Sequence, residues 1–164
     1  MSNPQRWKPS VTVAAVVARD GRYLLVEEQT REGVRLNNPA GHLDPEESLQ
    51  QAVVREVLEE TACRFKAEAV VGVYLSRFRR ADGEDVTYLR FAFCGSVSDP
   101  DPSLKLDDGI LRTVWMTPDE VRASQARHRS PLVLQSIEDH LAGRRYPLQL
   151  LTAHPSLYDP WIPG

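Results

Sequence analysis

Residues 41–63 read GHLDPEESLQQAVVREVLEETAC, and this stretch decides how the rest of the chain is interpreted. Asp44 suits a helix N-cap, Pro45 suits the first helical position, and Glu47 would complete a capping box. Residues 47–61 are rich in Glu, Gln and Leu and contain no glycine or proline, which favours a helix. The sequence therefore predicts a helix from about Pro45 to Thr61.

Three glutamates of this helix share one face. At about 100° per residue, Glu56, Glu59 and Glu60 fall within about 100° of one another. The apolar residues lie on another face, which we expect to pack onto a sheet: Val53, Val54, Val57 and Leu58. Like charges at this spacing cost about 0.2–0.5 kcal/mol per pair. Two interpretations follow. The glutamates could form a solvated acidic face, which is common on helices. They could instead bind Mg²⁺, which prefers carboxylate oxygens.

The spacing of the whole stretch decides between them. It resembles the Nudix box, G-x5-E-x7-R-E-U-x-E-E-x-G-U, in which U is a bulky aliphatic residue, and it departs from that pattern only at Ala62 and Cys63. Many fixed spacings match together, so the metal site is favoured. The family's glycine at position 62 suits left-handed backbone, and alanine there would cost about 1 kcal/mol if that conformation is kept.

The segments around the box predict strands and further helices. Strands are expected at Val11–Val17 and Tyr23–Glu28 around an Asp20-Gly21 turn, with a polar loop over residues 29–38. Other expected elements are strands at 69–78, 86–93 and 111–116 around a turn at 81–84, a loop at 98–102, a capped helix start at Thr117–Glu120, a helix at 131–141 and an irregular tail from Gly143. This order indicates a mixed sheet covered by helices on both faces. The resemblance implies the same fold class, an α/β/α sandwich, as a single domain over residues 1–164.

The resemblance also implies roles for residues of the box. The metal ligands would be Glu56, Glu59 and Glu60 with the backbone carbonyl of Ala40, and the metal Mg²⁺, with Mn²⁺ as an alternative. Glu56 is the first candidate for the base that accepts the proton of water. Glu47 would orient Arg55, the alternative being a capping role alone. Outside the box, Asp107 and Asp108 are candidates for a catalytic base or an extra metal ligand. An ordinary Asp-Asp-Gly turn is the favoured interpretation of these two residues.

Cationic and aromatic side chains outside the box are candidates for binding the substrate. Arg35, Arg77, Arg79 and Arg90 could hold phosphates, although a plain surface arginine is at least as expected for each. Tyr74 could stack on a ring, although strand aromatics more often belong to the core.

Composition limits the function classes. The 164 residues carry 20 basic and 23 acidic side chains, a formal charge of −3, which argues against a nucleic-acid polymer as partner. There is no apolar run of membrane-spanning length and no secretion signal, so we expect a cytoplasmic protein, a monomer or a homodimer. Cys63 and Cys94 are expected to be buried small residues, and no zinc-ligand spacing is present.

Segments beyond the box resemble the NudJ-type phosphatases of the Nudix family: Val11-Thr12-Val13-Ala14, Asn38-Pro39-Ala40-Gly41-His42-Leu43, Leu89-Arg90-Phe91, Arg129-Ser130-Pro131-Leu132-Val133 and Arg145-Tyr146-Pro147-Leu148. This likeness implies Mg²⁺-dependent hydrolysis of small diphosphate-containing molecules, namely nucleoside tri- and diphosphates and hydroxymethylpyrimidine pyrophosphate, with release of phosphate. One alternative is a Nudix pyrophosphohydrolase of nucleotide sugars or dinucleoside polyphosphates. Another is a regulatory Nudix domain that binds a nucleotide without hydrolysis.

Overall fold

The computed structural model describes residues 6–80 and 82–159. The ends of the predicted domain, and Ala81 of the predicted 81–84 turn, lie outside this part of the chain. The strands are β1 (Ser10–Arg19), β2 (Arg22–Thr30), β3 (Gly33–Asn37), β4 (Ala40–His42), β5 (Phe65–Arg79), β6 (Asp85–Val97) and β7 (Ile110–Met116). The helices are α1 (Leu49–Thr61), α2 (Pro118–Ala123) and α3 (Leu132–Leu141), with short 3-10 helices η1 (Gln125–Arg127), η2 (Leu148–Leu150) and η3 (Pro155–Leu157). None of the helices in the described ranges is long and apolar enough to cross a membrane.

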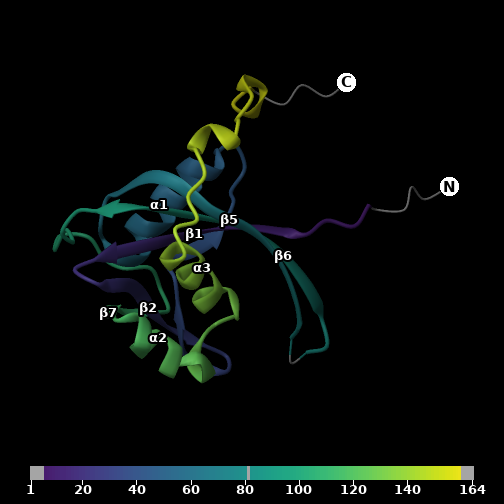
Figure 1. Ribbon diagram of the computed structural model, residues 1–164. Helices are drawn as coiled ribbons and strands as arrows, with labels where there is room; N and C mark the ends of the chain where they lie inside the picture. The colour runs from purple at the N-terminus through teal and green to yellow at the C-terminus, as the bar shows by residue number, and fades with distance from the viewer. Residues whose placement is uncertain (1–5, 81, 160–164) are drawn as a thin grey trace.

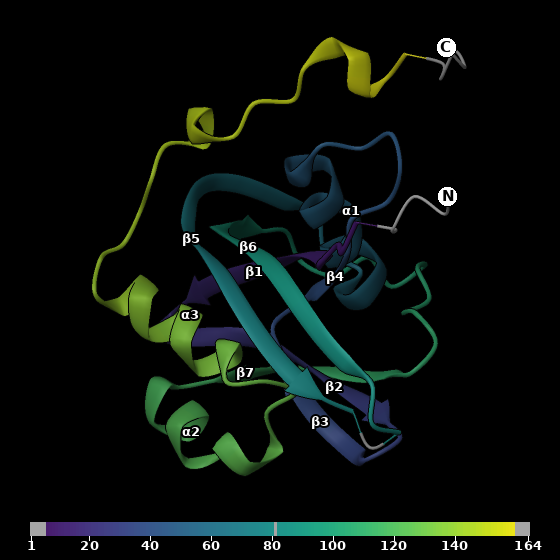
Figure 2. The ribbon, with the colours of Figure 1, turned by 90° about the vertical axis from the view of Figure 1, so that its right-hand side faces the viewer.

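One mixed sheet organises the molecule, in the order β3-β2-β1-β6-β5, with β4 also pairing with β1 and β7 with β2 (Figures 1 and 2). The β1–β6 pair is parallel and the other pairs are antiparallel. Strands β1 and β2 pair only beside their connecting turn, at Ala18 and Arg19. Nearer the start of β1, from Thr12 to Ala14, β4 pairs with β1 in place of β2. The two halves of the sheet therefore part from each other, and β4 lies beside β1 in the opening. The loop between β4 and α1, residues 43–48, is called the box loop.

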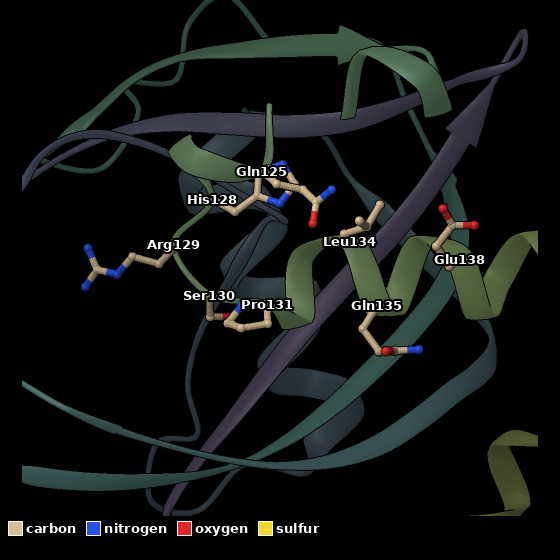
Figure 3. Close-up of a pocket in the computed structure, with 8 residues that line it drawn as sticks. All are labelled: Gln125, His128, Arg129, Ser130, Pro131, Leu134, Gln135 and Glu138. Carbon is tan, nitrogen blue, oxygen red and sulfur yellow. The ribbon is translucent and has the colours of Figure 1, made fainter. Parts of the chain in front are cut away.

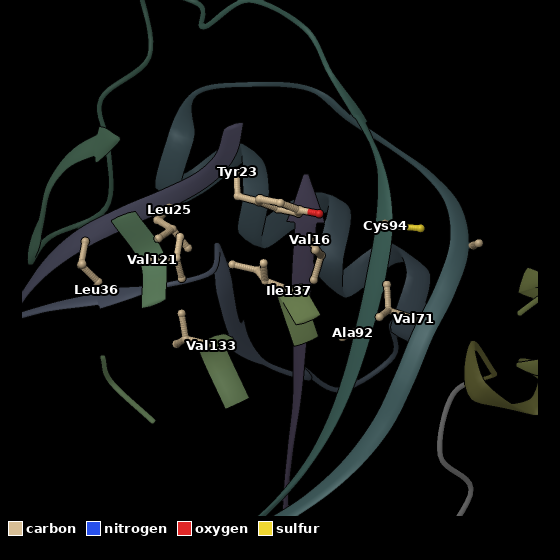
Figure 4. Close-up of a cluster of buried hydrophobic side chains, with 11 residues drawn as sticks. Val16, Tyr23, Leu25, Leu36, Val71, Ala92, Cys94, Val121, Val133 and Ile137 are labelled. Atoms are coloured by element: carbon tan, nitrogen blue, oxygen red, sulfur yellow. The ribbon is translucent and has the colours of Figure 1, made fainter. Parts of the chain in front are cut away.

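Helices cover both faces of the sheet. On one face α2 and α3 enclose a core that includes Leu25, Val71, Val121, Val133 and Ile137 (Figure 4). On the other face α1 packs against a second core through three buried residues: Ala52, Val53 and Val57. Each fully buried aliphatic side chain contributes about 1.5–3 kcal/mol. The predicted α/β/α sandwich is confirmed.

The predicted loop at residues 29–38 is wrong, because β2 runs on to Thr30 and β3 follows after a tight turn. In that turn the Thr30 hydroxyl donates to the carbonyl of Gly33 and accepts from the backbone N–H of Glu32, at 2.7 and 3.1 Å. Strand β3 lies at the edge of the sheet, where polar residues are common because they discourage pairing with other chains. That polarity suggested a loop.

Helix α1 begins later than predicted, at Leu49, with Ser48 as its N-cap. The Ser48 hydroxyl accepts from the backbone N–H of Gln51 at 3.1 Å, and the Gln51 amide oxygen accepts from that of Ser48 at 2.8 Å. This capping box prevails over the expected one at Asp44, whose backbone N–H still donates to Glu47 at 2.8 Å.

The expected apolar face of α1 is also wrong in part. Val54 and Leu58 are 37% and 36% exposed. The flank that they were expected to share with the core is occupied instead by Glu56 and Glu60, which are buried toward β4.

The other predictions about secondary structure agree in kind. Strands β5 and β6 are longer than expected and form one antiparallel hairpin, and Thr117 and Glu120 form the predicted capping box of α2. Cys63 and Cys94 are buried and free.

The chain after α3 forms a strap along the edge of the sheet and over α1 (Figure 2). Val70 of the edge strand β5 exchanges two backbone hydrogen bonds with Tyr146, both of 2.8 Å. Leu148 and Leu151 then pack against the core beneath α1. The Tyr158 hydroxyl donates to the side chain of Gln51 at 3.1 Å.

We expect Ser48→Ala to lower the free energy of unfolding by about 1 kcal/mol, because it removes the N-cap of α1. Asp44→Ala is the matched control: the Asp44 side chain is 61% exposed and makes one ion pair, with Arg55 at 3.4 Å, which contributes about 0.5 kcal/mol or less. Urea denaturation measures both. A larger loss in Asp44→Ala than in Ser48→Ala would place the cap where the sequence alone predicts it.

A buried carboxylate ties β2 to two neighbouring elements. Glu27 accepts from Arg112 of β7 at 2.6 Å and from Arg127 of η1 at 2.7 Å. These hydrogen bonds lower the pKa of Glu27 below its usual value of 4.5, and the one from Arg112 has the larger effect.

We expect Glu27→Gln to lower stability by about 1 kcal/mol at pH 7. A lowered folded-state pKa gives stabilisation that is present above the unfolded pKa and is lost as the pH falls through the folded value. The difference between wild type and variant should therefore shrink between pH 5 and pH 2 in urea melts. A difference that stays constant over this range would show that the ion pairs contribute nothing.

Candidate active site

A cavity of about 350 Å³ opens where the halves of the sheet part. Its walls come from strands β1 to β6, helix α1, the box loop and the start of α3. The lining residues are Thr12, Glu28, Asn37, Ala40, Gly41, His42, Asp44, Glu56, Glu60, Ser76, Phe78, Tyr88, Arg90, Arg129, Ser130 and Leu132.

Two box glutamates, Glu56 and Glu60, line this cavity and are 8% and 7% exposed. The Glu60 carboxylate accepts the backbone N–H of Ala40 at 2.9 Å. Burial, assisted by the nearby negative charge of Glu56, raises the pKa of Glu60 to about 8. Burial likewise raises the pKa of Glu56, although Arg55 opposes it. Both carboxylates are therefore held where their charged forms need a compensating cation.

The box glycine is required by close packing. A Cβ atom on Gly41 would lie 2.1 Å from the Glu56 carboxylate, far inside van der Waals contact. Gly41 therefore allows the backbone of β4 to lie against this carboxylate, which explains the residue type at the first box position.

Arg55 connects the box loop to the helix. Its guanidinium binds Glu47 through two hydrogen bonds, at 3.0 and 2.7 Å, and donates to the carbonyl of His42 at 3.0 Å. Its Nη1 atom also donates to Glu56 at 2.8 Å and to Glu59 at 3.0 Å. The hydrogen bonds from Arg55 lower the pKa of Glu47. Glu47 thus contacts Arg55, the residue that it is expected to orient.

Glu59 differs from the other two glutamates in that it does not line the cavity, although its carboxylate binds the same Nη1 atom of Arg55 as Glu56 does. Within residues 6–80 and 82–159, no three acidic, histidine or cysteine side chains form a group that could hold a metal ion as they stand. The donor set nevertheless suits a hard divalent cation, because two buried carboxylates repel each other and both supply oxygen ligands. The residues present therefore fit Mg²⁺ chemically.

The helix end keeps the left-handed backbone that the box requires. Ala62 has φ 57° and ψ 17°, and its N–H donates to the carbonyl of Leu58. The departure from glycine therefore carries the expected strain.

The loop that contains Asp107 and Asp108 packs against the end of α1, since the N–H of Asp107 donates to the carbonyl of Glu59 at 2.9 Å. The Asp107 side chain is exposed, and Asp108 pairs with Lys105 at 3.3 Å.

Of the candidate binding residues, Arg90 lines the cavity and is 8% exposed. Its burial lowers the pKa of the guanidinium to about 10. Its Nη1 atom is buried and has no hydrogen-bond partner.

The structure does not bring the other candidates into the cavity. Arg77 and Arg79 bind Asp85 across the β5–β6 hairpin, at 2.7 and 3.4 Å. The Tyr74 hydroxyl donates to Asp139 of α3 at 2.8 Å. Arg35 pairs with Glu32 at 3.7 Å and does not line the cavity.

Several lining residues were missed from the sequence, among them Glu28, Asn37 and Arg129. One signal for Glu28 is present: Leu24, Val26 and Glu28 alternate along β2, so a carboxylate continues a stripe of buried side chains. Arg129 precedes α3, and its Nη1 lies 3.5 Å from the Glu28 carboxylate. Nothing local in the sequence indicates that contact.

Aromatic rings form part of the cavity wall. Phe78 and Tyr88 stack with ring centroids 5.3 Å apart and planes 14° from parallel. His42 lies against Tyr88, 6.1 Å away and tilted by 53°. Such a wall suits the flat face of a ring.

A second hollow of about 480 Å³ lies between η1 and α3 (Figure 3). Its residues include His128, Leu134, Gln135 and Glu138, and it shares Arg129 and Ser130 with the first cavity. Burial lowers the pKa of His128, which favours its neutral imidazole.

Comparison with known proteins gives consistent matches. The NUDIX domain model matches residues 7–136. The phosphatase NudJ of Escherichia coli (strain K12) is 35% identical over 146 residues, which cover 88% of this chain and 92% of NudJ. A solved NUDIX hydrolase from Nitrosomonas europaea is 54% identical, with a TM-score of 0.83, and covers 90% of this chain and 98% of its own. The NUDIX domain of Shewanella oneidensis NrtR, solved with ADP ribose, shares the fold at 21% identity and a TM-score of 0.64, over 86% of this chain and 92% of its own.

Proposed function

The chain belongs to the Nudix hydrolase family, and we propose that it is a Mg²⁺-dependent phosphatase of nucleoside tri- and diphosphates and of hydroxymethylpyrimidine pyrophosphate. The observation that carries this proposal is one cavity lined both by two buried box carboxylates, Glu56 and Glu60, and by the buried arginine Arg90. Carboxylates suit a metal and an arginine suits a phosphate. The likeness to NudJ supports the release of orthophosphate.

The metal, with Mn²⁺ as a possible substitute for Mg²⁺, would be held by Glu56, Glu59, Glu60 and the carbonyl of Ala40. When bound, a divalent cation supplies positive charge to the phosphate oxygens and makes water a better nucleophile. Glu56 is the carboxylate that we assign to accept the proton of the attacking water. Its carboxylate lines the cavity.

Charged groups of the cavity would hold the substrate. Arg90 and Arg129 would bind the phosphates that do not react, Arg90 from the buried wall and Arg129 from a more exposed position. Arg55 and Glu47 would act as positioning residues. Arg55 holds the carboxylate of Glu56, and its bond to Glu47 holds the box loop. Such positioning residues typically change activity by about 10- to 100-fold.

Product analysis tests the proposal. Purified protein with Mg²⁺, and separately with Mn²⁺, is incubated with a nucleoside triphosphate, a diphosphate, a nucleotide sugar, a dinucleoside polyphosphate and the pyrimidine pyrophosphate. Orthophosphate released stepwise from the triphosphate and the diphosphate is the expected result. Pyrophosphate, or cleavage only of the nucleotide sugar or the dinucleoside polyphosphate, would instead support the pyrophosphohydrolase alternative. Tight nucleotide binding without turnover of any compound would support the regulatory alternative.

A further inference from the structure

The cavity contains acceptors that binding of phosphate does not explain. Glu28 lies on the wall of a site that we propose binds anions, yet it belongs to no box position. Its neighbours are Arg129, whose Nη1 lies 3.5 Å from Oε1, together with the side chains of Asn37 and Arg90. A carboxylate there repels phosphate oxygens. Its presence points to a ligand group that donates hydrogen bonds.

Polar atoms without partners concentrate at this wall. Among the described residues, five buried side-chain atoms have no hydrogen-bond partner, and four belong to residues that line the cavity: Thr12 Oγ1, Glu28 Oε1, Asn37 Oδ1 and Arg90 Nη1. Of these, Glu28 Oε1 has a long ion pair of 3.5 Å to Arg129. Thr12, Asn37 and Arg90 are 4%, 6% and 8% exposed. An unpaired buried polar group costs about 1–3 kcal/mol. Such a set is expected where a ligand completes the bonding.

The sheet places two of these groups on one surface. Val26 of β2 is opposite Asn37 of β3, and Glu28 is opposite Arg35. Glu28 and Asn37 are therefore diagonal neighbours on one face of the strand pair, since Val26 and Glu28 point the same way. Both can offer an oxygen acceptor to one ligand, while Arg90 can only donate.

The aromatic wall of the cavity favours a ligand that contains a ring. The stacked pair Phe78 and Tyr88 lines the same cavity, and aromatic walls favour flat, polarisable ligands. A volume of about 350 Å³ suits a small molecule at the low end of ordinary ligand pockets.

We propose that Glu28 and Asn37 recognise the exocyclic amino group of a heterocyclic ring in the substrate, with Arg90 donating to an adjacent ring nitrogen, carbonyl or phosphate oxygen. The proposal rests on the proposed function, because it assigns the organic part of that substrate. It makes the site selective for amino-bearing bases over their oxo counterparts. A site that hydrogen-bonds a substrate group rejects the analogue that lacks it, because its own buried groups are then left unpaired.

Paired substrates test this selectivity. CDP and UDP differ in the amino or oxo group and the ring nitrogen next to it, and so do ADP and IDP. We expect wild type to favour the amino member of at least one pair by about tenfold or more in kcat/KM. We expect Glu28→Gln to lower that ratio several-fold, because a glutamine amide can accept from an amino group or donate to an oxo group.

A control variant and a binding experiment test whether the effect is specific to Glu28 and independent of hydrolysis. Glu32→Gln makes the same chemical change on an exposed side chain outside the cavity and should leave the ratio unchanged. Calorimetric binding of CMP, UMP, AMP and IMP without metal measures recognition without hydrolysis, so the preference can be detected even if the proposed phosphatase activity fails.

Three results would overturn the inference. One is equal kcat/KM within both pairs for wild type, together with no preference among the monophosphates. Another is an unchanged ratio in Glu28→Gln. The third is a fall in kcat of Glu28→Gln that is equal for both members of each pair, which would place Glu28 in catalysis.

Discussion

Replacing Glu60 by glutamine lowers kcat by about a hundredfold or more, a size typical for removal of one charged group from a catalytic centre. The fold remains intact, because the glutamine oxygen can still accept the N–H of Ala40, which donates to Glu60 at 2.9 Å. The glutamine also removes a buried carboxylate whose pKa burial raises to about 8. Thermal stability without metal should therefore be equal or higher in the variant.

A second measurement separates this prediction from a general loss of structure. Mg²⁺ should raise the melting temperature of wild type and do so much less in Glu60→Gln, since binding to the folded state stabilises it. Glu68→Gln, at an exposed position of β5, is the matched control and should behave like wild type in both assays. Normal turnover in a well-folded Glu60→Gln protein would contradict the assigned metal site.

A methyl group at position 41 should be nearly as damaging. The Cβ atom of Gly41→Ala would lie 2.1 Å from the carboxylate of Glu56, so Glu56 must leave its place beside β4. We expect kcat to fall by about a hundredfold, because a misplaced charged group loses most of its effect. Steady-state kinetics with a urea melt measures the change and shows whether the fold survives.

A double-mutant cycle tests that the loss acts through Glu56. Glu56→Ala removes the side chain that the new methyl group would meet, so adding Gly41→Ala to it should cause little further loss of kcat. Independent, additive losses would show that Gly41 matters for another reason, such as approach of the substrate to the backbone.

The sequence alone predicted most accurately those site residues that lie within one helix or strand. Glu56 and Glu60 share a helix face because the period of the helix fixes their directions. Gly41 is the first position of the box, but its contact with Glu56 is visible only in the structure. The start of α1 was misplaced, because Asp44 and Ser48 both carry capping signals and only packing decides between them.

The binding residues depend on contacts between distant elements, which spacing does not reveal. Arg90 could not be separated from Arg77, because the sequence alone does not show that Arg77 is paired with Asp85 on an exposed hairpin. Glu28 and Arg129 meet across about a hundred residues of chain. Their meeting follows from the parting of the sheet halves, a property of the whole fold.

The C-terminal strap has a consequence for the handling of this protein. It occupies the backbone of the edge strand β5 at Val70. Near the end of the described residues, Tyr158 donates to Gln51, whose side chain also caps α1. A protein shortened after Gly143 would therefore present a bare strand edge, which is a template for pairing with other chains. Trimming by proteases, or a tag that displaces the strap, should promote aggregation before it affects catalysis.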